Sequence, residues 1–204
     1  MTAHDPYTPP AAVVQDLPSE ASRQAPFYVV SVPKLIVLFV CTLGLYQLFW
    51  FYMHWRRWKA GRNETIWPVA RAIFALFYTH ALARRIRATL AARGLPAHRG
   101  TAALATLYVA VTALDWGSGL AWPWISPRIP AGWIWIGEWG SLLLMPVVGA
   151  CLVGLQRAAD AACGDPHAHT NRRFTLANLA WIVLGVSATA WVVFMATTPI
   201  DIVL

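Results

Sequence analysis

The sequence is poor in charged residues, which make up 12% of the chain, against roughly 25% in a typical soluble domain. Acidic side chains are the scarcest, because nine Asp and Glu stand against 16 Lys and Arg. Apolar residues fill 58% of the chain and gather in uncharged blocks such as 35–53 and 176–199. A helix needs roughly 20 apolar residues to cross the hydrocarbon core of a bilayer. The composition therefore excludes an ordinary soluble domain and predicts an all-α, multi-pass bundle of transmembrane helices.

The sequence also lacks the short motifs of common enzymes and cofactor sites. It has no Gly-rich phosphate loop, no G-x-S-x-G elbow, no H-E-x-x-H pair and no C-x-x-C pair. The three cysteines, Cys41, Cys151 and Cys163, are odd in number and mostly set in apolar runs, which argues against a disulfide framework. We therefore expect no cofactor, no metal and no nucleic-acid partner. The absences favour a protein that is not an enzyme, although a membrane enzyme with an unfamiliar site stays open.

Four stretches are long and apolar enough to be membrane spans, and we expect them at about 35–53, 102–121, 133–155 and 176–198. The first ends in an aromatic cluster that includes Trp50, Phe51 and Trp55. Amphipathic rings at that position are typical of the headgroup boundary. Three prolines in the connection 122–132 predict an irregular loop there.

The regions before and between these spans are predicted to behave differently. Residues 1–33 hold six prolines and predict a disordered N-terminal tail, followed by a helical membrane domain over 34–204. No cleavable signal peptide is expected, because the first apolar run begins near Phe27 with no basic cluster before it. Segment 66–92 holds only 12 uncharged residues between Arg71 and Arg84, a length that suits an interfacial or re-entrant helix better than a span.

The basic residues predict the topology. Ten of the 16 Lys and Arg lie between residues 54 and 101, together with one acid, Glu64. Short loops rich in Lys and Arg stay in the cytoplasm, so the loop 84–101 is expected inside a bacterial inner membrane, with the C-terminus in the periplasm. Four spans would place the N-terminal tail outside, whereas a crossing by 66–83 would place it inside.

Three runs carry a resemblance to known proteins. They read P-K-L-I-V-L-F-V-C-T-L-G-L-Y-Q-L-F-W-F-Y-M-H-W-R-R-W-K at 33–59, W-P-V-A-R-A-I-F-A-L-F-Y-T-H-A-L-A-R-R-I at 67–86, and N-R-R-F-T-L-A-N at 171–178. Together they resemble a family of small inner-membrane proteins of Gram-negative bacteria that is catalogued as a domain of unknown function. The resemblance implies the location and the general architecture, and it transfers no catalytic residue and no substrate.

The main functional hypothesis is a non-enzymatic membrane protein that interacts with lipid or with another protein. Basic residues near a membrane surface attract anionic headgroups at about 1 kcal/mol each, although the same charges also serve simply to orient the chain. Small residues at four-residue spacing, such as Ala102, Thr106 and Ala110, let helices approach closely and favour a homo-oligomer or a membrane-protein partner. The residues predicted to contact anionic lipid are Arg56, Arg57, Lys59, Arg62, Arg84, Arg85 and Arg87.

A second hypothesis is a small oligomeric transporter or channel subunit. Asp115 lies near the outer end of one predicted span and Glu138 near the outer start of the next. Ionisable groups inside a membrane are costly and are candidates for an ion or proton site, with Arg128 as a partner. The alternative is that both acids lie at interface depth, where six tryptophans bracket them.

A third hypothesis is a membrane-bound enzyme or redox subunit. His54 and His80 are the residue type that ligates haem, although interfacial histidines without a ligand are commoner. Cys163, Asp165, His167 and His169 form a compact group with zinc-binding side chains. Their spacing matches no finger signature, and the Gly-Asp-Pro sequence predicts an ordinary polar turn.

Overall fold

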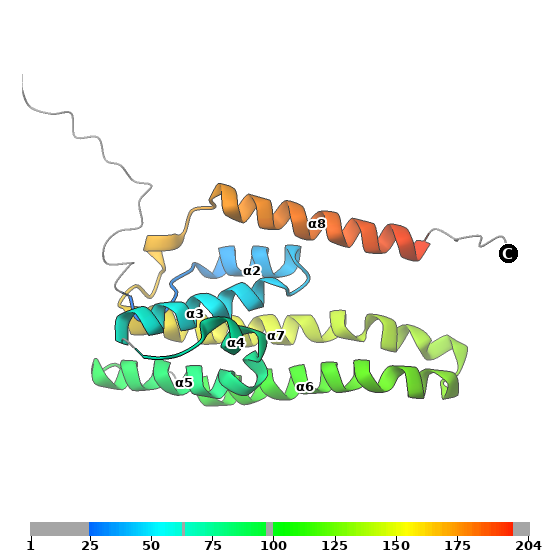
Figure 1. Ribbon diagram of the computed structural model, residues 1–204, viewed down its shortest axis with the longest axis horizontal. Coiled ribbons are helices and arrows are strands. Elements are labelled where there is room, and N and C mark those ends of the chain that lie inside the picture. Colours follow the sequence, from blue (N-terminus) through cyan, green and yellow to red (C-terminus); the bar gives the residue numbers. More distant parts are fainter. Residues whose placement is uncertain (1–24, 63, 97–99, 198–204) are drawn as a thin grey trace, which may run out of the picture.

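The computed structural model describes residues 25–62, 64–96 and 100–197, and all the regular structure within them is helical (Figure 1). The prediction of an all-α chain is therefore confirmed. Three short 3-10 turns lie in the connections: η1 (Ser126–Arg128), η2 (Ala131–Trp133) and η3 (His169–Asn171). The seven α-helices of the described residues are α2 (Val32–Cys41), α3 (Tyr46–Arg62), α4 (Pro68–Ile73), α5 (Ala75–Ala92), α6 (Thr101–Ile125), α7 (Ile134–Cys163) and α8 (Leu176–Thr197).

Three of these helices, α6, α7 and α8, are long and apolar enough to cross a membrane. They overlap the spans predicted at 102–121, 133–155 and 176–198, and neither α4 nor α5 is among the candidates. Large apolar side chains stand exposed along them, for example Leu120 at 79% and Leu184 at 62%. Because such surface is stable only in an apolar solvent, length, composition and exposure together support a transmembrane protein.

The remaining predicted span, 35–53, is not one helix. A total of four spans is therefore not confirmed. The chain breaks after α2, where Leu43 and Gly44 take positive φ angles of 47° and 86°. The Gly44 N–H donates to the Phe39 carbonyl at 2.8 Å, which closes the helix end as a Schellman motif does. Thr42 Oγ1 donates to the Leu38 carbonyl and accepts from the Tyr46 N–H. These contacts turn the chain back on itself.

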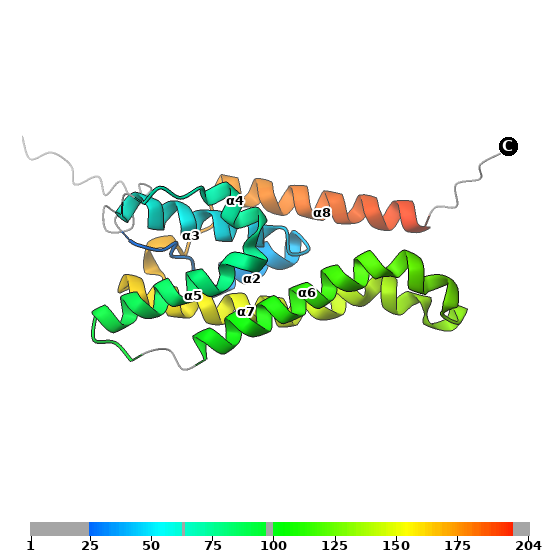
Figure 2. The same ribbon diagram turned by 60° about the horizontal axis from the view of Figure 1, so that its bottom comes forward.

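Helices α2 and α3 therefore form a hairpin that returns to the end from which it started (Figures 1 and 2). With α4 and α5, the hairpin packs against one half of the long α6–α7 pair. The opposite half of α6 and α7 lacks this cover in both views. The molecule thus has a thick end, which holds the core, and a thin end made of long apolar helices.

The aromatic cluster of α3 lies in the protein core, whereas the rings of an interfacial belt face lipid. Trp50, Phe51 and Trp55 are each 0% exposed. The buried positions of α3 fall at 46, 50, 51, 54, 55 and 58, the three-to-four-residue spacing of one helix face. This face packs with Leu82 and Ile86 of α5 and with the small residues of α7 into one core.

The membrane domain begins earlier than residue 34. Residues Phe27–Ser31, called here the extended segment, are buried, and Phe27 and Val30 are 0% exposed. The predicted tail thus ends before this segment, and its residues 1–24 lie outside the described part of the chain. Phenylalanine, tyrosine and valine favour extended backbone, and helix α2 starts only after this segment, at Val32.

Two further boundaries differ from the prediction. Helix α6 continues through Pro123 to Ile125, although the proline has no N–H to donate to the carbonyl one turn earlier. The small-residue face expected at Ala102 and Ala110 is exposed, and α6 instead buries Thr101, Ala105, Tyr108 and Thr112. Helix α7 extends to Cys163, eight residues beyond its predicted end, and two polar residues of this extension, Gln156 and Asp160, are buried.

We expect Gly185→Ala to destabilise the protein by about 1–3 kcal/mol, the usual cost of overpacking. A Cβ at Gly185 of α8 would overlap the carbonyl oxygen of Cys41, the last residue of α2, and lie 2.8 Å from the Cα of Thr42, which begins the α2–α3 turn. The measurement is the free energy of unfolding in mixed detergent micelles. The control is Gly117→Ala in α6, where a Cβ meets open space and a gain of up to about 1 kcal/mol is expected. Equal effects of the two changes would contradict the close approach of α8.

Candidate functional site

Gln156 of α7 is the centre of a buried hydrogen-bond network at the thick end. Its side-chain oxygen accepts from the indole N–H of Trp50 at 2.5 Å and lies 3.3 Å from Nε2 of His54. Its side-chain nitrogen donates to the Tyr28 carbonyl at 2.9 Å and to Oδ1 of Asp160 at 2.6 Å. One residue thereby connects α3, α7 and the extended segment.

The partners fix the direction of every bond in this network. An indole N–H can only donate and a main-chain carbonyl can only accept, so Trp50 and Tyr28 determine which atom of Gln156 is oxygen. Because that oxygen is an acceptor, Nε2 of His54 must carry the hydrogen. Nδ1 of His54 is then an unprotonated nitrogen, and it has no partner among the described residues.

His54 is held as a neutral imidazole in an aromatic cage. It is 0% exposed, and its ring centre lies 4.2 Å from that of Trp50 and about 6 Å from those of Phe27 and Tyr28. Burial lowers the pKa of His54 to about 3, against the opposing effect of its contact with Gln156. The side chain therefore serves packing and hydrogen bonding at neutral pH and carries no charge.

A second set of buried bonds ties the start of α2 to the connection between α7 and α8. Lys34 is 2% exposed, and its ammonium donates to Oδ1 of Asn171 at 2.7 Å and to the Arg173 carbonyl at 2.6 Å. The Asn171 amide donates in turn to the Val29 carbonyl at 2.8 Å and to the Tyr28 hydroxyl at 3.2 Å. The sequence analysis singled out none of Gln156, Asp160 and Lys34. For Gln156 and Asp160, the available signal was their spacing of four residues just beyond the apolar stretch of α7.

The seven residues predicted to contact anionic lipid fall into different surroundings. Arg85 forms an ion pair with Glu64 at 3.2 Å, and Arg62 stacks 4.2 Å from the ring centre of Trp58. Arg57 is partly buried. The other four are exposed and form no ion pair within the described part of the chain; we call Arg56, Lys59, Arg84 and Arg87 the exposed quartet.

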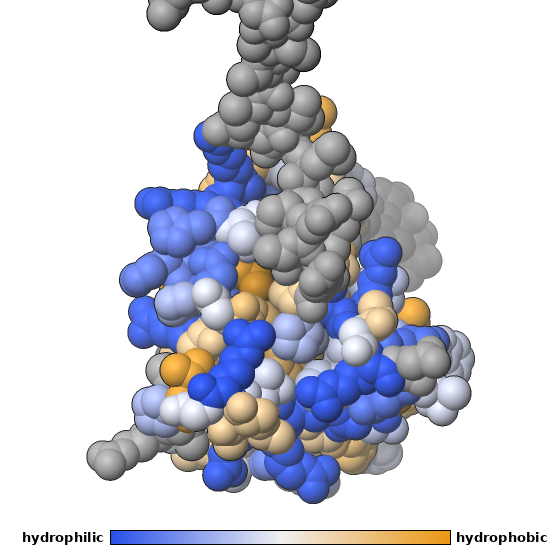
Figure 3. Space-filling view, turned by 90° about the vertical axis from the view of Figure 1, so that its left-hand side faces the viewer, coloured by the Kyte–Doolittle hydropathy of each residue, from blue (hydrophilic) through white to orange (hydrophobic). Residues whose placement is uncertain are grey.

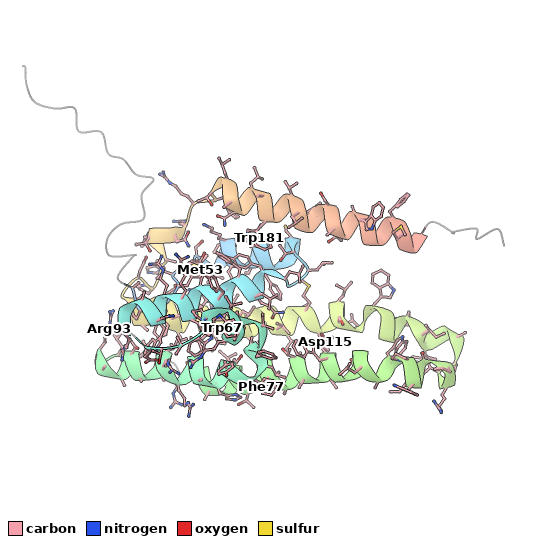
Figure 4. All side chains as sticks on the ribbon, in the orientation of Figure 1. Met53, Trp67, Phe77, Arg93, Asp115 and Trp181 are labelled. Carbon is pink, nitrogen blue, oxygen red and sulfur yellow. The ribbon has the colours of Figure 1, made fainter. Side chains whose placement is uncertain are left out.

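The exposed quartet lies at the thick end. Its members belong to the second halves of α3 and α5, and Arg93, at the end of α5, marks the same end (Figure 4). Viewed onto this end, the surface is largely hydrophilic, with apolar groups between the polar ones (Figure 3). Among the described basic residues, Arg128 alone lies in the α6–α7 connection at the opposite end.

Two residues of the predicted ion site, Asp115 and Arg128, have separate partners. Asp115 of α6 is half-buried, and its Oδ1 accepts from the Ser141 hydroxyl of α7 at 2.6 Å. Arg128 donates to the Trp124 carbonyl instead. It follows Asp115 by 13 residues, about 20 Å along a helix. Glu138 lies one turn before Ser141 on α7, and its side chain is outside the described part of the chain.

The histidines and the cysteine group likewise have separate contacts. His80 is exposed and lies 3.1 Å from Thr106 Oγ1, on different elements from the His54 cage. The Asp165 carboxylate accepts hydrogen bonds from the main chain of His169 and Thr170, while the Cys163 thiol lies 3.7 Å from the Phe27 carbonyl. Within residues 25–62, 64–96 and 100–197, no three His, Cys, Asp or Glu side chains come together as a metal site would require.

Comparison of this chain with protein-family models, with curated proteins and with solved structures finds no match. The resemblance noted at 33–59, 67–86 and 171–178 therefore stays a prediction, and functional inference depends on the residues themselves.

Proposed function

We propose that this chain is a non-enzymatic integral protein of a bacterial inner membrane whose basic end binds anionic lipid headgroups. The single observation that carries the proposal is the division of the molecule into two ends. Long helices with exposed apolar side chains form one end, and exposed cations with no ion-pair partner among the described residues form the other. Cations placed next to a membrane-spanning unit lie where acidic headgroups lie, and each contributes about 1 kcal/mol there.

The exposed quartet is the part of the basic surface that supports this proposal. Arg62 and Arg85 stack on tryptophans of α3, and Arg85 also binds Glu64, so both already have partners within the protein. The quartet has no such partner in the described residues and stands in solvent or lipid. Arginine forms paired hydrogen bonds with phosphate oxygens, which fits a phospholipid headgroup.

The proposed orientation places the thick end in the cytoplasm, because short segments rich in Lys and Arg stay there. The α2–α3 hairpin starts and ends at this side, so it adds no crossing. Three crossings by α6, α7 and α8 then leave the N-terminus in the cytoplasm and the C-terminus in the periplasm. A cytoplasmic N-terminus differs from the prediction for four spans, which would place the N-terminal tail outside.

We expect alkaline phosphatase, which is active only in the periplasm, to be active when fused after Leu204. Fused after Gly94, in the basic region, it should be inactive and serves as the control. A fluorescent protein that matures only in the cytoplasm should be fluorescent when placed before Met1. A silent fusion after Leu204 contradicts the charge argument, and a dark N-terminal fusion contradicts the hairpin.

Lipid contact is tested by changing all four residues of the exposed quartet to Gln in the full chain. Reconstituted wild-type protein should prefer phosphatidylglycerol over phosphatidylcholine, measured as quenching of tryptophan fluorescence by brominated forms of each lipid. Four charges at about 1 kcal/mol each predict at least a tenfold loss of preference in the variant. Arg128→Gln, at the opposite end, should leave the preference unchanged. A wild-type preference in the quartet variant refutes the proposal.

A further inference from the structure

Two cavities follow one another along the seam between α2 and α7. The first is an apolar groove of about 540 Å³, lined on one side by Leu35, Phe39 and Val40 of α2 and on the other by Leu142, Met145 and Val153 of α7. The second is a polar cavity of about 760 Å³ at the start of α2 and the end of α7. Because the two helices run in opposite directions, the polar cavity lies at the thick end and the groove leads away from it.

The apolar groove has the size and the setting of a site for a hydrocarbon chain. Its volume falls within the roughly 300–1,000 Å³ of ligand pockets, and every lining residue is apolar. Val153 and Leu142 are eleven residues apart on α7, which is about 16 Å along the helix. One leaflet of the hydrocarbon core is about 15 Å thick, half of roughly 30 Å. The groove therefore matches one acyl chain in one leaflet.

The polar cavity has the charge that an acidic headgroup requires. Arg157 and Arg172 line it, both are exposed, and neither forms an ion pair with another described residue. The acidic residue that also lines it, Asp160, is 2% exposed and accepts a hydrogen bond from Gln156 at 2.6 Å. The cations are thus available to a ligand, whereas the acid is turned into the buried network.

We infer that the α2–α7 seam is a site for a single anionic phospholipid, with its phosphate between Arg157 and Arg172 and one acyl chain in the apolar groove. Arg157 lies four residues beyond Val153 on α7, about 6 Å from the end of the groove, so one molecule reaches both cavities. This inference rests on the proposed lipid-binding function and deepens it. It names a separate site, on other helices than the exposed quartet, that holds one lipid rather than a layer of headgroups.

The test is native mass spectrometry of the full-length protein, purified in mild detergent and mixed with dioleoyl phosphatidylglycerol or dioleoyl phosphatidylcholine. The acyl chains are identical, so the comparison isolates the headgroup charge. Wild-type protein should retain one phosphatidylglycerol and at least tenfold less phosphatidylcholine. Changing both Arg157 and Arg172 to Gln should lower the retained phosphatidylglycerol at least fivefold. These two side chains are exposed, so the variant is expected to fold, which its thermal transition verifies.

The groove is tested separately by filling it. Ala150 lines the groove, and Ala150→Phe should also lower retention at least fivefold, whereas Ala188→Phe on the exposed face of α8 should not. Unchanged retention in either the arginine variant or Ala150→Phe overturns the seam site, as does equal retention of the two lipids. Changing Arg84 and Arg87 to Gln should leave the retained lipid in place. If the seam variants retain lipid while the quartet variant loses its bilayer preference, the proposed function stands and this inference falls.

Discussion

Gln156→Leu is expected to destabilise the protein by about 3–5 kcal/mol, the largest effect of any single substitution considered for this chain. Leucine has nearly the same volume, so the change removes hydrogen bonds without opening a cavity. The Trp50 indole N–H, the Tyr28 carbonyl and the Asp160 carboxyl each lose a partner while they stay buried. Each buried polar group left without a partner costs about 1–3 kcal/mol, and effects within one network do not simply add.

The matched control is Gln47→Leu, the same chemical change at a glutamine whose side chain makes one hydrogen bond within the described part of the chain. Gln47 accepts one hydrogen bond, from the Tyr108 hydroxyl at 3.0 Å, and is partly exposed. Its loss should cost about 1 kcal/mol. Both variants are compared with the wild type by the free energy of unfolding in mixed micelles. Similar costs for the two substitutions would show that Gln156 does not connect the helices as the geometry requires.

Hydropathy was sufficient to predict the three long helices. Their apolar stretches are continuous, and a run of about 20 apolar residues has few stable alternatives to a helix in a membrane. The starts of α6, α7 and α8 agree with the predicted starts to within one residue. This agreement reflects the fact that length and composition alone determine whether a helix can span a bilayer.

The same reasoning could not find the α2–α3 hairpin, because the turn is apolar. Hydropathy treats Thr42, Leu43 and Gly44 as part of one continuous stretch, yet the chain reverses there through two residues with positive φ. Gly44 was the available signal, since glycine adopts this backbone conformation at little cost. Leu43 carries no such signal, because leucine rarely adopts a positive φ angle.

The buried network was missed for a related reason. Gln156 and Asp160 lie just beyond the predicted span 133–155, whereas in the structure they continue helix α7 as a buried pair one turn apart. Their partners come from the extended segment and from α3, more than 100 residues earlier in the chain. Burial of a polar side chain is stable only with such partners, and a single sequence gives no means of identifying them.

The buried imidazole of His54 should make the protein sensitive to acid. Its pKa lies near 6.5 in the unfolded chain and is lowered to about 3 by burial in the folded protein. Between these values the unfolded chain binds more protons, so the contribution to stability is complete above pH 6.5 and is lost as the pH falls toward 3. The loss amounts to about 1.4 kcal/mol per pH unit, or about 2 kcal/mol at pH 5.

His54→Phe isolates this contribution, because phenylalanine preserves the ring contacts with Phe27 and Trp50 and cannot bind a proton. The variant should be about 1 kcal/mol less stable than the wild type at pH 7.5, where it loses one hydrogen bond. At pH 5 it should be more stable than the wild type, since the difference in unfolding free energy between the two shifts by about 2 kcal/mol.

Other titrating groups, including Asp160 in the same network, are common to both proteins, so comparing the two at each pH removes their direct contribution. Trp50→Phe, a loss from the same network without a titrating group, should cost the same at both pH values. A difference between His54→Phe and the wild type that stays constant from pH 7.5 to 5 would mean that His54 can be protonated without opening the core.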